Sequence, residues 1–207
     1  MAETEGVIKY RLQFETAEPP CEDLSELNVC RSILHGLHLI GQDATRYQGY
    51  GFGNLSRRSQ LDPAQFIISG TQTGHLAELQ AEHYARILQT DITHSFVQAC
   101  GRVEPSSEAL THAMFYRLNS ALQCVIHVHS PELWHFGLEH AYPTTHPDIA
   151  YGTTQMAQEI ERLYQSAELR QSRTLVMAGH EDGVICFGDS IDLAGQALLH
   201  LWVDSRC

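Results

Sequence analysis

The sequence predicts a single α/β domain of stacked layers, and three of its features agree on this. Short apolar runs typical of strands alternate with longer stretches in which apolar residues recur at helical spacing. The connections between these segments are short, and neither an internal repeat nor a linker divides the chain. Its 207 residues, with 43% hydrophobic content, can bury one substantial core. We therefore expect one domain over residues 1–207.

The elements of the first half follow from apolar spacing. Leu27, Cys30, Leu34 and Leu37 recur at intervals of three and four residues, which indicates a helix. The expected elements up to residue 100 are, in order, a strand over roughly Val7–Phe14, a helix from Leu24 to about Ile40, a glycine-rich loop Tyr47–Gly53, a strand Phe66–Ser69, a loop Gly70–Gly74, a helix Leu79–Thr90 and a strand Phe96–Cys100.

The second half begins with a helix whose start is marked by Pro105-Ser-Ser-Glu108, with serines at cap positions. Two apolar runs near the C-terminal end flank a polar turn and are assigned as strands. The expected elements are, in order, a helix from Pro105 to about Leu118, a strand Cys124–His129, a helix Gly152–Leu163, a strand Thr174–Met177, a strand Val184–Phe187 and a helix Ile191–Val203.

The charge of the chain argues against two classes of partner. It has 13 Lys+Arg against 25 Asp+Glu, a formal net charge of −12. Such a chain repels nucleic acid and anionic membrane surfaces, and no basic run could follow a phosphate backbone. A small anionic substrate remains compatible with this charge, because backbone N–H groups can bind an anion locally.

Cysteine usage and the N-terminal sequence indicate a cytoplasmic protein. None of the six cysteines has C-x-x-C spacing, and Cys124 and Cys186 lie within apolar runs. We interpret all six, Cys207 included, as small buried hydrophobic residues in a reducing compartment. The N-terminus lacks the basic and apolar regions of a signal peptide, and no apolar stretch approaches membrane-spanning length.

The segment Val125-Ile-His-Val-His129 carries the strongest chemical signal. Side chains alternate between faces in a strand, so Val125, His127 and His129 are expected to share one face. Two imidazoles side by side on a stiff strand suit a divalent metal, which needs neutral nitrogens that converge. The chain has 13 histidines, however, so the pair could equally be exposed or hydrogen-bonded without any metal. The strand alone leaves both interpretations open.

His180 and Glu108 are the next candidates. His180 lies in the turn Ala178–Gly183 between two apolar strands, where it could reach another strand's end. By itself this segment favours an exposed histidine in a polar turn. Glu108 lies in the first turn of a helix, where a carboxylate is stabilised by the helix dipole. The functional alternative is a general acid/base or a labile fourth metal ligand.

Several short polar segments could bind an anion. Ser106 and Ser107 are either helix caps or hydroxyls at a helix N-terminus that binds a phosphate. The segments Gly53–Ser56 and Thr71–Gly74 are either simple turns or further donors to the same anion.

The order and spacing of these segments resemble those of the class II aldolase/adducin head domain family. The resemblance runs from about Leu27 to Leu201, so residues 1–23 would form an N-terminal extension. The matching blocks, in the family's order, are Gly53-Asn-Leu-Ser56, Ile68-Ser-Gly-Thr-Gln-Thr-Gly74, Pro105-Ser-Ser-Glu108, His127-Val-His129, Tyr151-Gly-Thr153, and the His180 turn followed by a strand end at Gly188.

The resemblance implies a fold, a reaction and a site. The fold would be a three-layer α/β/α sandwich around a mostly antiparallel sheet. The activity would be cleavage of a phosphorylated ketose by a metal-dependent aldolase through a metal-stabilised enediolate. Epimerases, dehydratases and decarboxylases share the metal core, whereas the adducin head is a scaffold without the histidines. The resemblance assigns His127, His129 and His180 as ligands of zinc or another divalent metal (iron, manganese or cobalt), Glu108 as acid/base, and as phosphate-binding residues Asn54, Thr73, Gly74, Ser106 and Ser107.

The sequence departs from the family pattern at two places. The family's Asn-His-Gly turn is here Gly179-His-Glu-Asp-Gly183, and we expect Glu181 and Asp182 to form a solvated acidic turn. The segment between His129 and Tyr151 is short, with Tyr142 and His146 as its nearest candidates for the aldehyde end of the site. Since the family forms homotetramers with sites between subunits, we expect Tyr142 and His146 near such a boundary; the alternative is a surface loop.

Overall fold

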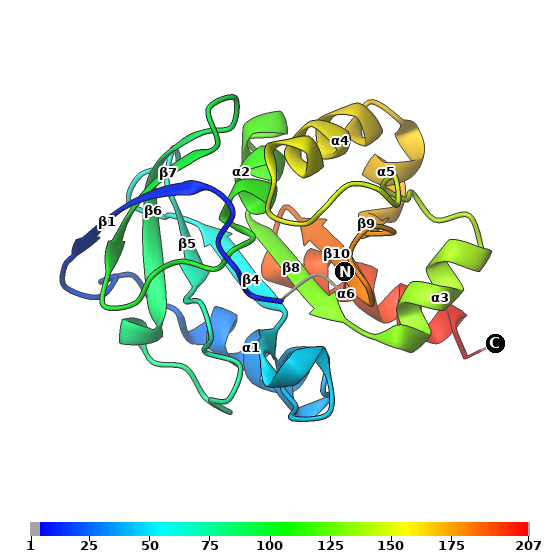
Figure 1. Cartoon of the computed structure of the whole chain (residues 1–207), viewed down its shortest axis with the longest axis horizontal. Helices are drawn as coiled ribbons and strands as arrows, with labels where there is room; N and C mark the ends of the chain where they lie inside the picture. Colours follow the sequence, from blue (N-terminus) through cyan, green and yellow to red (C-terminus); the bar gives the residue numbers. More distant parts are fainter. Residues whose placement is uncertain (1–4, 207) are drawn as a thin grey trace.

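The computed structural model describes residues 5–206, which fold around one large mixed sheet (Figure 1). Of its neighbouring strand pairs, only β1–β7 is parallel, and all others are antiparallel. The strands, in spatial order, are β1 (Arg11–Thr16), β7 (Phe96–Gly101), β6 (Tyr84–Asp91), β5 (Phe66–Ser69), β4 (Asn54–Arg58), β8 (Cys124–His129), β10 (Gly183–Gly188) and β9 (Thr174–Val176).

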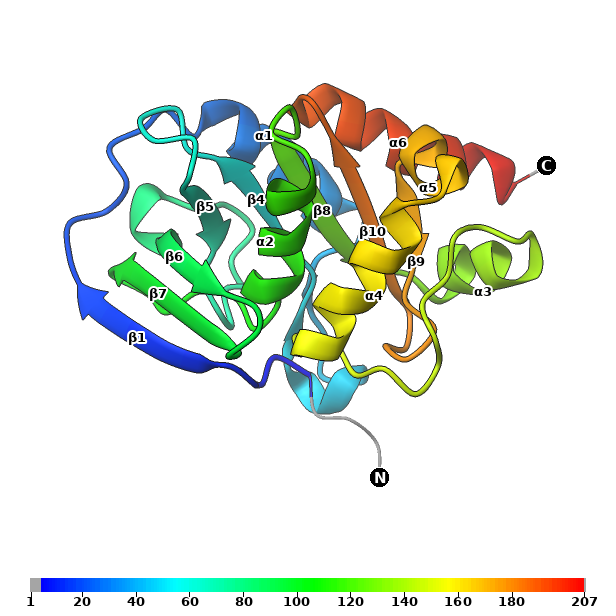
Figure 2. The same ribbon diagram turned by 90° about the horizontal axis from the view of Figure 1, so that it is seen from above.

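Helices cover both faces of the sheet, so the molecule has the three α/β/α layers that the family resemblance implies (Figure 2). One face carries α2 (Ala109–Leu118), α4 (Thr154–Tyr164) and the short α5 (Ala167–Ser172). The other carries α1 (Ser25–Gly36), α3 (Pro131–Glu139) and α6 (Ile191–Asp204). Small elements complete the chain at β2 (Gly41–Gln42), η1 (Tyr47–Gly49), β3 (Gly51–Phe52) and η2 (Ala81–His83).

Strand β8 separates the two hydrophobic cores, and its alternation is as predicted. Val125 packs into the core beneath α2 and α4, whereas Ile126 and Val128 pack into the core beneath α1 and α6. His127 and His129 therefore lie on the Val125 side of the strand. All six residues of β8 are buried, so the two imidazoles are held on a strand fixed by packing on both faces.

The sequence predictions fail most clearly at Leu79–Thr90. This segment forms the turn η2 and strand β6 instead of a helix. β6 pairs antiparallel with β5 on one side and β7 on the other, so sheet pairing overrides the local helical spacing. Strand β4 and helices α3 and α5 were not predicted, and the N-terminal strand lies at Arg11–Thr16, later than the predicted Val7–Phe14.

Two expectations about the whole chain can be compared with residues 5–206. Cys124 and Cys186 are buried free thiols, as predicted. The prediction of burial is wrong for Cys21, which is exposed, and for Cys30 and Cys100, which are partly exposed, although all three are free thiols. Cys207 and residues 1–4 lie outside the described part of the chain. Within that part, no helix combines the length and the apolar character needed to cross a bilayer.

Candidate metal and anion site

The sheet topology brings His180 to the two histidines of β8. Strand β10 pairs antiparallel with β8, and the register places Gly183 opposite His129 and Ile185 opposite His127. The turn that connects β9 to β10 therefore lies beside the end of β8, and His180 is a residue of this turn. A Cβ on Gly183 would lie 2.8 Å from His180 Cδ2 and 3.2 Å from His127 Cε1. The close approach of the rings thus needs a glycine at this position.

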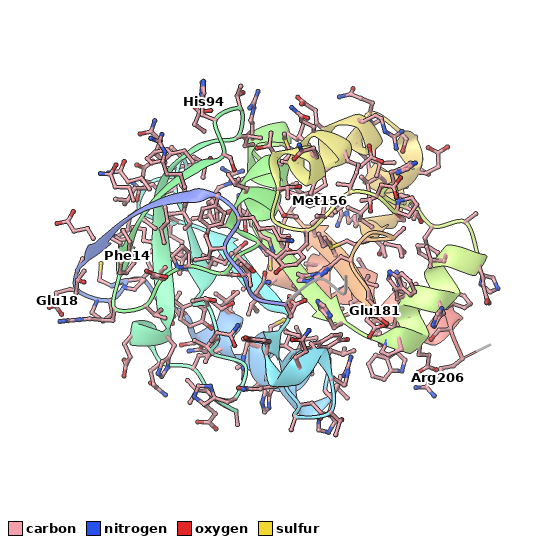
Figure 3. The ribbon with its side chains drawn as sticks, in the orientation of Figure 1. Phe14, Glu18, His94, Met156, Glu181 and Arg206 are labelled. Carbon is pink, nitrogen blue, oxygen red and sulfur yellow. The ribbon has the colours of Figure 1, made fainter. Side chains whose placement is uncertain are left out.

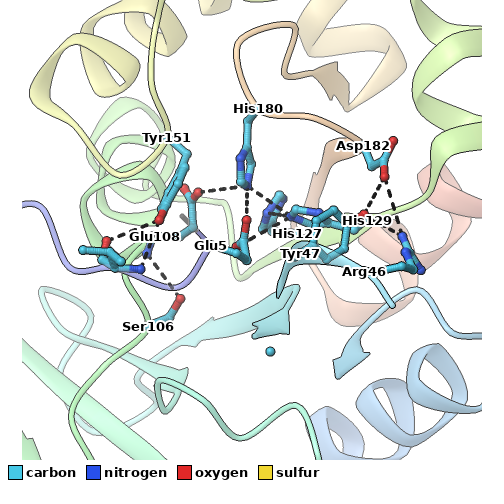
Figure 4. A network of polar contacts seen from close by, with 12 residues as sticks. Glu5, Arg46, Tyr47, Ser106, Glu108, His127, His129, Tyr151, His180 and Asp182 are labelled. Atoms are coloured by element: carbon cyan, nitrogen blue, oxygen red, sulfur yellow. Dashed lines mark hydrogen bonds and ion pairs between the residues drawn. The ribbon is translucent and has the colours of Figure 1, made fainter. Parts of the chain in front are cut away.

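The Nε2 atoms of the three histidines converge on one point (Figure 4). His129 Nε2 lies 3.0 Å from His127 Nε2 and 3.1 Å from His180 Nε2. A ring nitrogen carries either a proton or a lone pair, so it can donate or accept one hydrogen bond but not two. Hydrogen bonding therefore does not explain both close contacts of His129 Nε2. Two nitrogens bound to one tetrahedral zinc are about 3.3 Å apart, close to the separations here. The three side chains therefore fit a shared divalent cation.

Burial of all three rings, and a backbone contact of His127 Nδ1, favour the neutral form of the imidazoles, which is the form that binds a metal. His127 Nδ1 lies 3.3 Å from the Val184 carbonyl, so Nδ1–H can donate there and leave the lone pair on Nε2. Burial lowers the pKa of His127 to about 4. Burial also lowers the pKa of His129 and of His180 well below the ordinary value, and the neighbouring histidines lower both further. Three neutral imidazoles suit zinc, iron and other divalent transition metals.

Glu108 lies at the edge of this trio. It directly precedes helix α2 and is only 1% exposed, and its Oε1 lies 3.7 Å from His180 Nε2. The backbone N–H of Glu108 donates to Ser106 Oγ at 3.2 Å. The prediction that the serines cap the helix is wrong, because α2 begins only at Ala109, after Glu108, and no side chain that the structure describes caps it. A buried carboxylate this close to the trio can reach the cation, or a substrate bound to it.

The five predicted anion-binding residues meet in one small pocket beside the histidines. Its lining includes Asn54, Thr73, Gly74, Ser106 and Ser107, which come from β4, the loop after β5 and the segment before α2. Asn54 pairs with His127 across β4 and β8, which fixes the pocket against the trio. Among residues 5–206, no group hydrogen-bonds to the buried Asn54 Oδ1. Its lining also contains Glu5 and Gly6.

The loop before β3 closes the other side of the trio, which the sequence analysis did not foresee. The Tyr47 ring meets the His129 ring edge-on at a centroid distance of 4.8 Å, and its hydroxyl donates to Asp182 Oδ2. Arg46 lies 3.7 Å from the same carboxylate. The glycine-rich sequence marked this stretch as a loop, but nothing in it indicated contact with β8.

The prediction of a solvated acidic turn is confirmed for Glu181 and wrong for Asp182. Glu181 is exposed at the molecular surface (Figure 3). Asp182 is not solvated, because it is only 8% exposed and accepts the Tyr47 hydroxyl while facing Arg46. Asp182 therefore holds the loop that contains Arg46 and Tyr47 over the site, because Arg46 balances its negative charge and the Tyr47 hydroxyl donates a hydrogen bond to it.

The segment 142–151 runs back along the sheet edge. The Thr145 N–H donates to the Val176 carbonyl at 3.0 Å, and the Tyr142 hydroxyl donates to Asp204 at 2.9 Å. His146 is exposed. Tyr151, at the end of the segment, is fully buried, and its ring lies 4.4 Å from that of His180. The start of the segment is therefore held by β9 and α6 of the same chain, and its end reaches the site.

Comparison with known proteins identifies the family of the chain. A profile of the family described as class II aldolase and adducin N-terminal domain matches residues 42–202. No curated protein matches the chain.

Three solved structures illustrate the likeness of fold. L-fuculose-1-phosphate aldolase from Thermus thermophilus is 16% identical with a TM-score of 0.62, over 88% of this chain and 90% of that one. YgbL from Escherichia coli, described as a candidate aldolase, epimerase or decarboxylase, is 16% identical with a TM-score of 0.65, over 87% of this chain and 85% of that one. A sugar-phosphate aldolase from Thermotoga maritima is 14% identical with a TM-score of 0.59, over 86% of this chain and 92% of that one.

Proposed function

This chain belongs to the class II aldolase and adducin N-terminal domain family, and on that premise we propose that it is a metal-dependent lyase. Its substrate in this proposal is a phosphorylated ketose, of which it breaks a carbon–carbon bond. The observation that carries the proposal is one constellation: three convergent histidine nitrogens, a buried carboxylate beside them and a small polar pocket adjoining both.

The roles of the residues follow from where they lie. His127, His129 and His180 would hold the divalent cation, with zinc as our first choice. A bound cation would act as a Lewis acid on the substrate's oxygens and stabilise the negative charge of an enediolate. Glu108, within 3.7 Å of the trio, would carry the proton to or from the reacting carbon.

The polar pocket would orient the substrate through its phosphate. Ser106, Ser107, Asn54 and Thr73 offer hydroxyl and amide groups, and Gly74 offers a backbone N–H, all beside the histidines. Binding energy gained at the phosphate, away from the reacting atoms, can hold the carbonyl end against the cation and Glu108.

Other reactions through the same type of intermediate remain the principal alternatives. Epimerisation, dehydration or decarboxylation of a sugar phosphate would use the same histidines and Glu108. A scaffold without catalysis, as in the adducin head, has no use for three buried neutral imidazoles that converge on one point. Their burial and convergence therefore favour an enzyme.

The experiment that tests the proposal is an assay of the metal-loaded protein on a panel of ketose phosphates. A lyase releases dihydroxyacetone phosphate, which a coupled reduction detects. We expect release from at least one member of the panel, and its loss in His127→Ala. Conversion of a panel member without bond cleavage would replace the lyase by one of the alternative reactions. Metal-loaded protein that alters none of the panel would overturn the proposal for these substrates.

A further inference from the structure

The N-terminal segment, residues 5–10, crosses the candidate site before the chain enters the sheet as β1. Glu5 Oε2 lies 3.6 Å from His180 Nε2, and Glu5 Oε1 lies 3.9 Å from His129 Nε2. Glu5 is only 8% exposed, and Figure 4 shows it in the middle of the polar network. A second carboxylate, besides that of Glu108, therefore faces the histidine trio.

Specific contacts seat this segment. The Val7 N–H donates to the Tyr151 hydroxyl at 3.0 Å, and the Lys9 ammonium lies 3.4 Å from the centroid of the same ring. The buried Tyr10 hydroxyl donates to the Ser106 carbonyl at 2.8 Å. The segment is thus tied to Tyr151, whose ring packs on His180, and to the segment that precedes Glu108. Its position over the site is built into the fold.

The same segment occupies the anion pocket. Glu5 and Gly6 form part of the lining, and about 20 Å³ of free space is left. That space holds about one or two water molecules, so Glu5 and Gly6 take up room beside the predicted phosphate-binding residues. Gly6 has φ +72° and is pressed against the loop after β5, where an added Cβ would lie 2.1 Å from Gln72 Nε2. Movement of Glu5 and Gly6 would widen the pocket for the phosphate group of a substrate.

Glu5 also lies between two cavities. Beyond it is a space of about 350 Å³ whose lining includes Glu5, Tyr47, Trp134 and His180. Displacement of Glu5 would join this space to the anion pocket. The joined site would be lined by Ser107 on one side of Glu5 and by Tyr47 and Trp134 on the other.

We propose that Glu5 is a ligand of the bound cation in the resting protein, and that residues 5–10 form a cap which a phosphorylated substrate displaces. The proposal rests on the proposed function of the same site. Ligand atoms of a four-coordinate site are about 3.3 Å apart, and the Glu5 oxygens approach this spacing from two of the histidines. The Glu5 carboxylate and a substrate phosphate are both anions and compete for one cation and one pocket. The cap therefore strengthens cation binding and weakens phosphate binding.

Two binding measurements on the full chain test the cap. Zn²⁺ affinity is measured by competition with a chelating indicator, and inorganic phosphate affinity by calorimetry on the zinc-loaded protein. Glu5→Gln removes one ligand and one negative charge, so we expect zinc binding to weaken about tenfold or more. Phosphate binding should strengthen about threefold or more, because its competitor is lost. Glu15→Gln is the matched control, since Glu15 is exposed on β1 and should change neither value.

The opposite direction of the two shifts distinguishes a cap from a general loss of structure. Zinc and phosphate affinities in Glu5→Gln that stay within twofold of the wild type would overturn the cap while the proposed function stands. Weaker binding of both would also overturn it, because a lost fold and not a lost competitor would then explain the change. Absence of zinc binding in the wild type would overturn the proposed function and the cap together.

Discussion

Four buried histidines, His112, His127, His129 and His180, set the chemistry of this molecule at the scale of single residues. Burial lowers the pKa of each, and for His127 to about 4. His112 is not part of the trio, but its Nδ1 hydrogen-bonds with Ser56 Oγ at 2.7 Å deep in the core. Neutral imidazoles are what a divalent cation requires, so burial prepares the three ligands for binding at neutral pH.

These lowered pKa values predict how the stability of the metal-free protein depends on pH. In the unfolded chain the four histidines bind protons below about pH 6.5, whereas in the folded chain burial holds the pKa of each below that value, and that of His127 at about 4. The unfolded state therefore binds more protons in this window, and stability falls as the pH falls. Each such histidine contributes a slope of up to about 1.4 kcal/mol per pH unit. Urea unfolding of chelator-treated protein at about pH 7.5, 6 and 5 measures the slope, and a flat profile would refute the prediction.

Glu108→Gln should separate catalysis from metal binding. The amide keeps the shape of the side chain but cannot shuttle a proton, so we expect turnover to fall about 10²–10⁴-fold. Zinc content should stay at the wild-type level, because the three histidines are unchanged. Steady-state rates and metal analysis of the same sample measure both. Retained turnover together with lost zinc would contradict the assigned role.

At the scale of elements, the segment before α2 connects the anion pocket to the histidine trio. Ser107 lines the anion pocket, and Glu108 follows it directly at the helix start. A carboxylate placed at Ser107 would repel the substrate phosphate and fill the pocket. We therefore expect Ser107→Asp to raise KM for a phosphorylated substrate about tenfold or more, with a smaller effect on kcat.

Ser190→Asp is the matched control for this substitution. Ser190 caps α6, where its side chain accepts the Leu193 N–H, and aspartate caps a helix equally well. It lines neither the anion pocket nor the neighbouring cavity. An unchanged KM in Ser107→Asp would mean that the substrate carries no phosphate at this pocket.

Local pattern predicted the elements that carry most of the site. The strand Cys124–His129 needed only apolar alternation and was found where expected. The helix predicted from Pro105 to about Leu118 was also found, but it begins at Ala109, so Glu108 precedes it instead of lying in its first turn. Strand β6, in contrast, forms because it pairs with its neighbours in the sheet, although the spacing of its apolar residues resembles that of a helix. The contacts of Glu5, Tyr47 and Asp182 with the histidines join segments far apart in the sequence, and no local pattern carries that information.

At the scale of the whole molecule, residues from distant segments meet around a single point, among them Glu108, which directly precedes α2. The segment at Glu5, strand β4, strand β8 and the turn before β10 meet there, while β1–β7 and β9 extend the sheet to either side. The lining of the 350 Å³ cavity beside the trio includes Trp134 and Pro147. Tyr142 and His146 lie in the segment that contains Pro147 and leads to Tyr151.

The family resemblance predicts that the site lies at a boundary with a second subunit. In a homotetramer, Tyr142 and His146 would lie near the boundary and close the pocket. Light scattering at micromolar concentration should give about four times the chain mass of 23.2 kDa. A mass near 23.2 kDa would mean that the site is complete within one chain.

The most direct test of the account is the metal content of the purified protein and of single substitutions at the three histidines. We expect one divalent cation per chain in the wild type, and substoichiometric metal in His127→Ala, His129→Ala and His180→Ala, each still folded by circular dichroism. His140→Ala, an exposed histidine on the end of α3, should retain the full complement. A wild-type protein without stoichiometric metal, or a His180 variant that keeps it, would contradict the central claim.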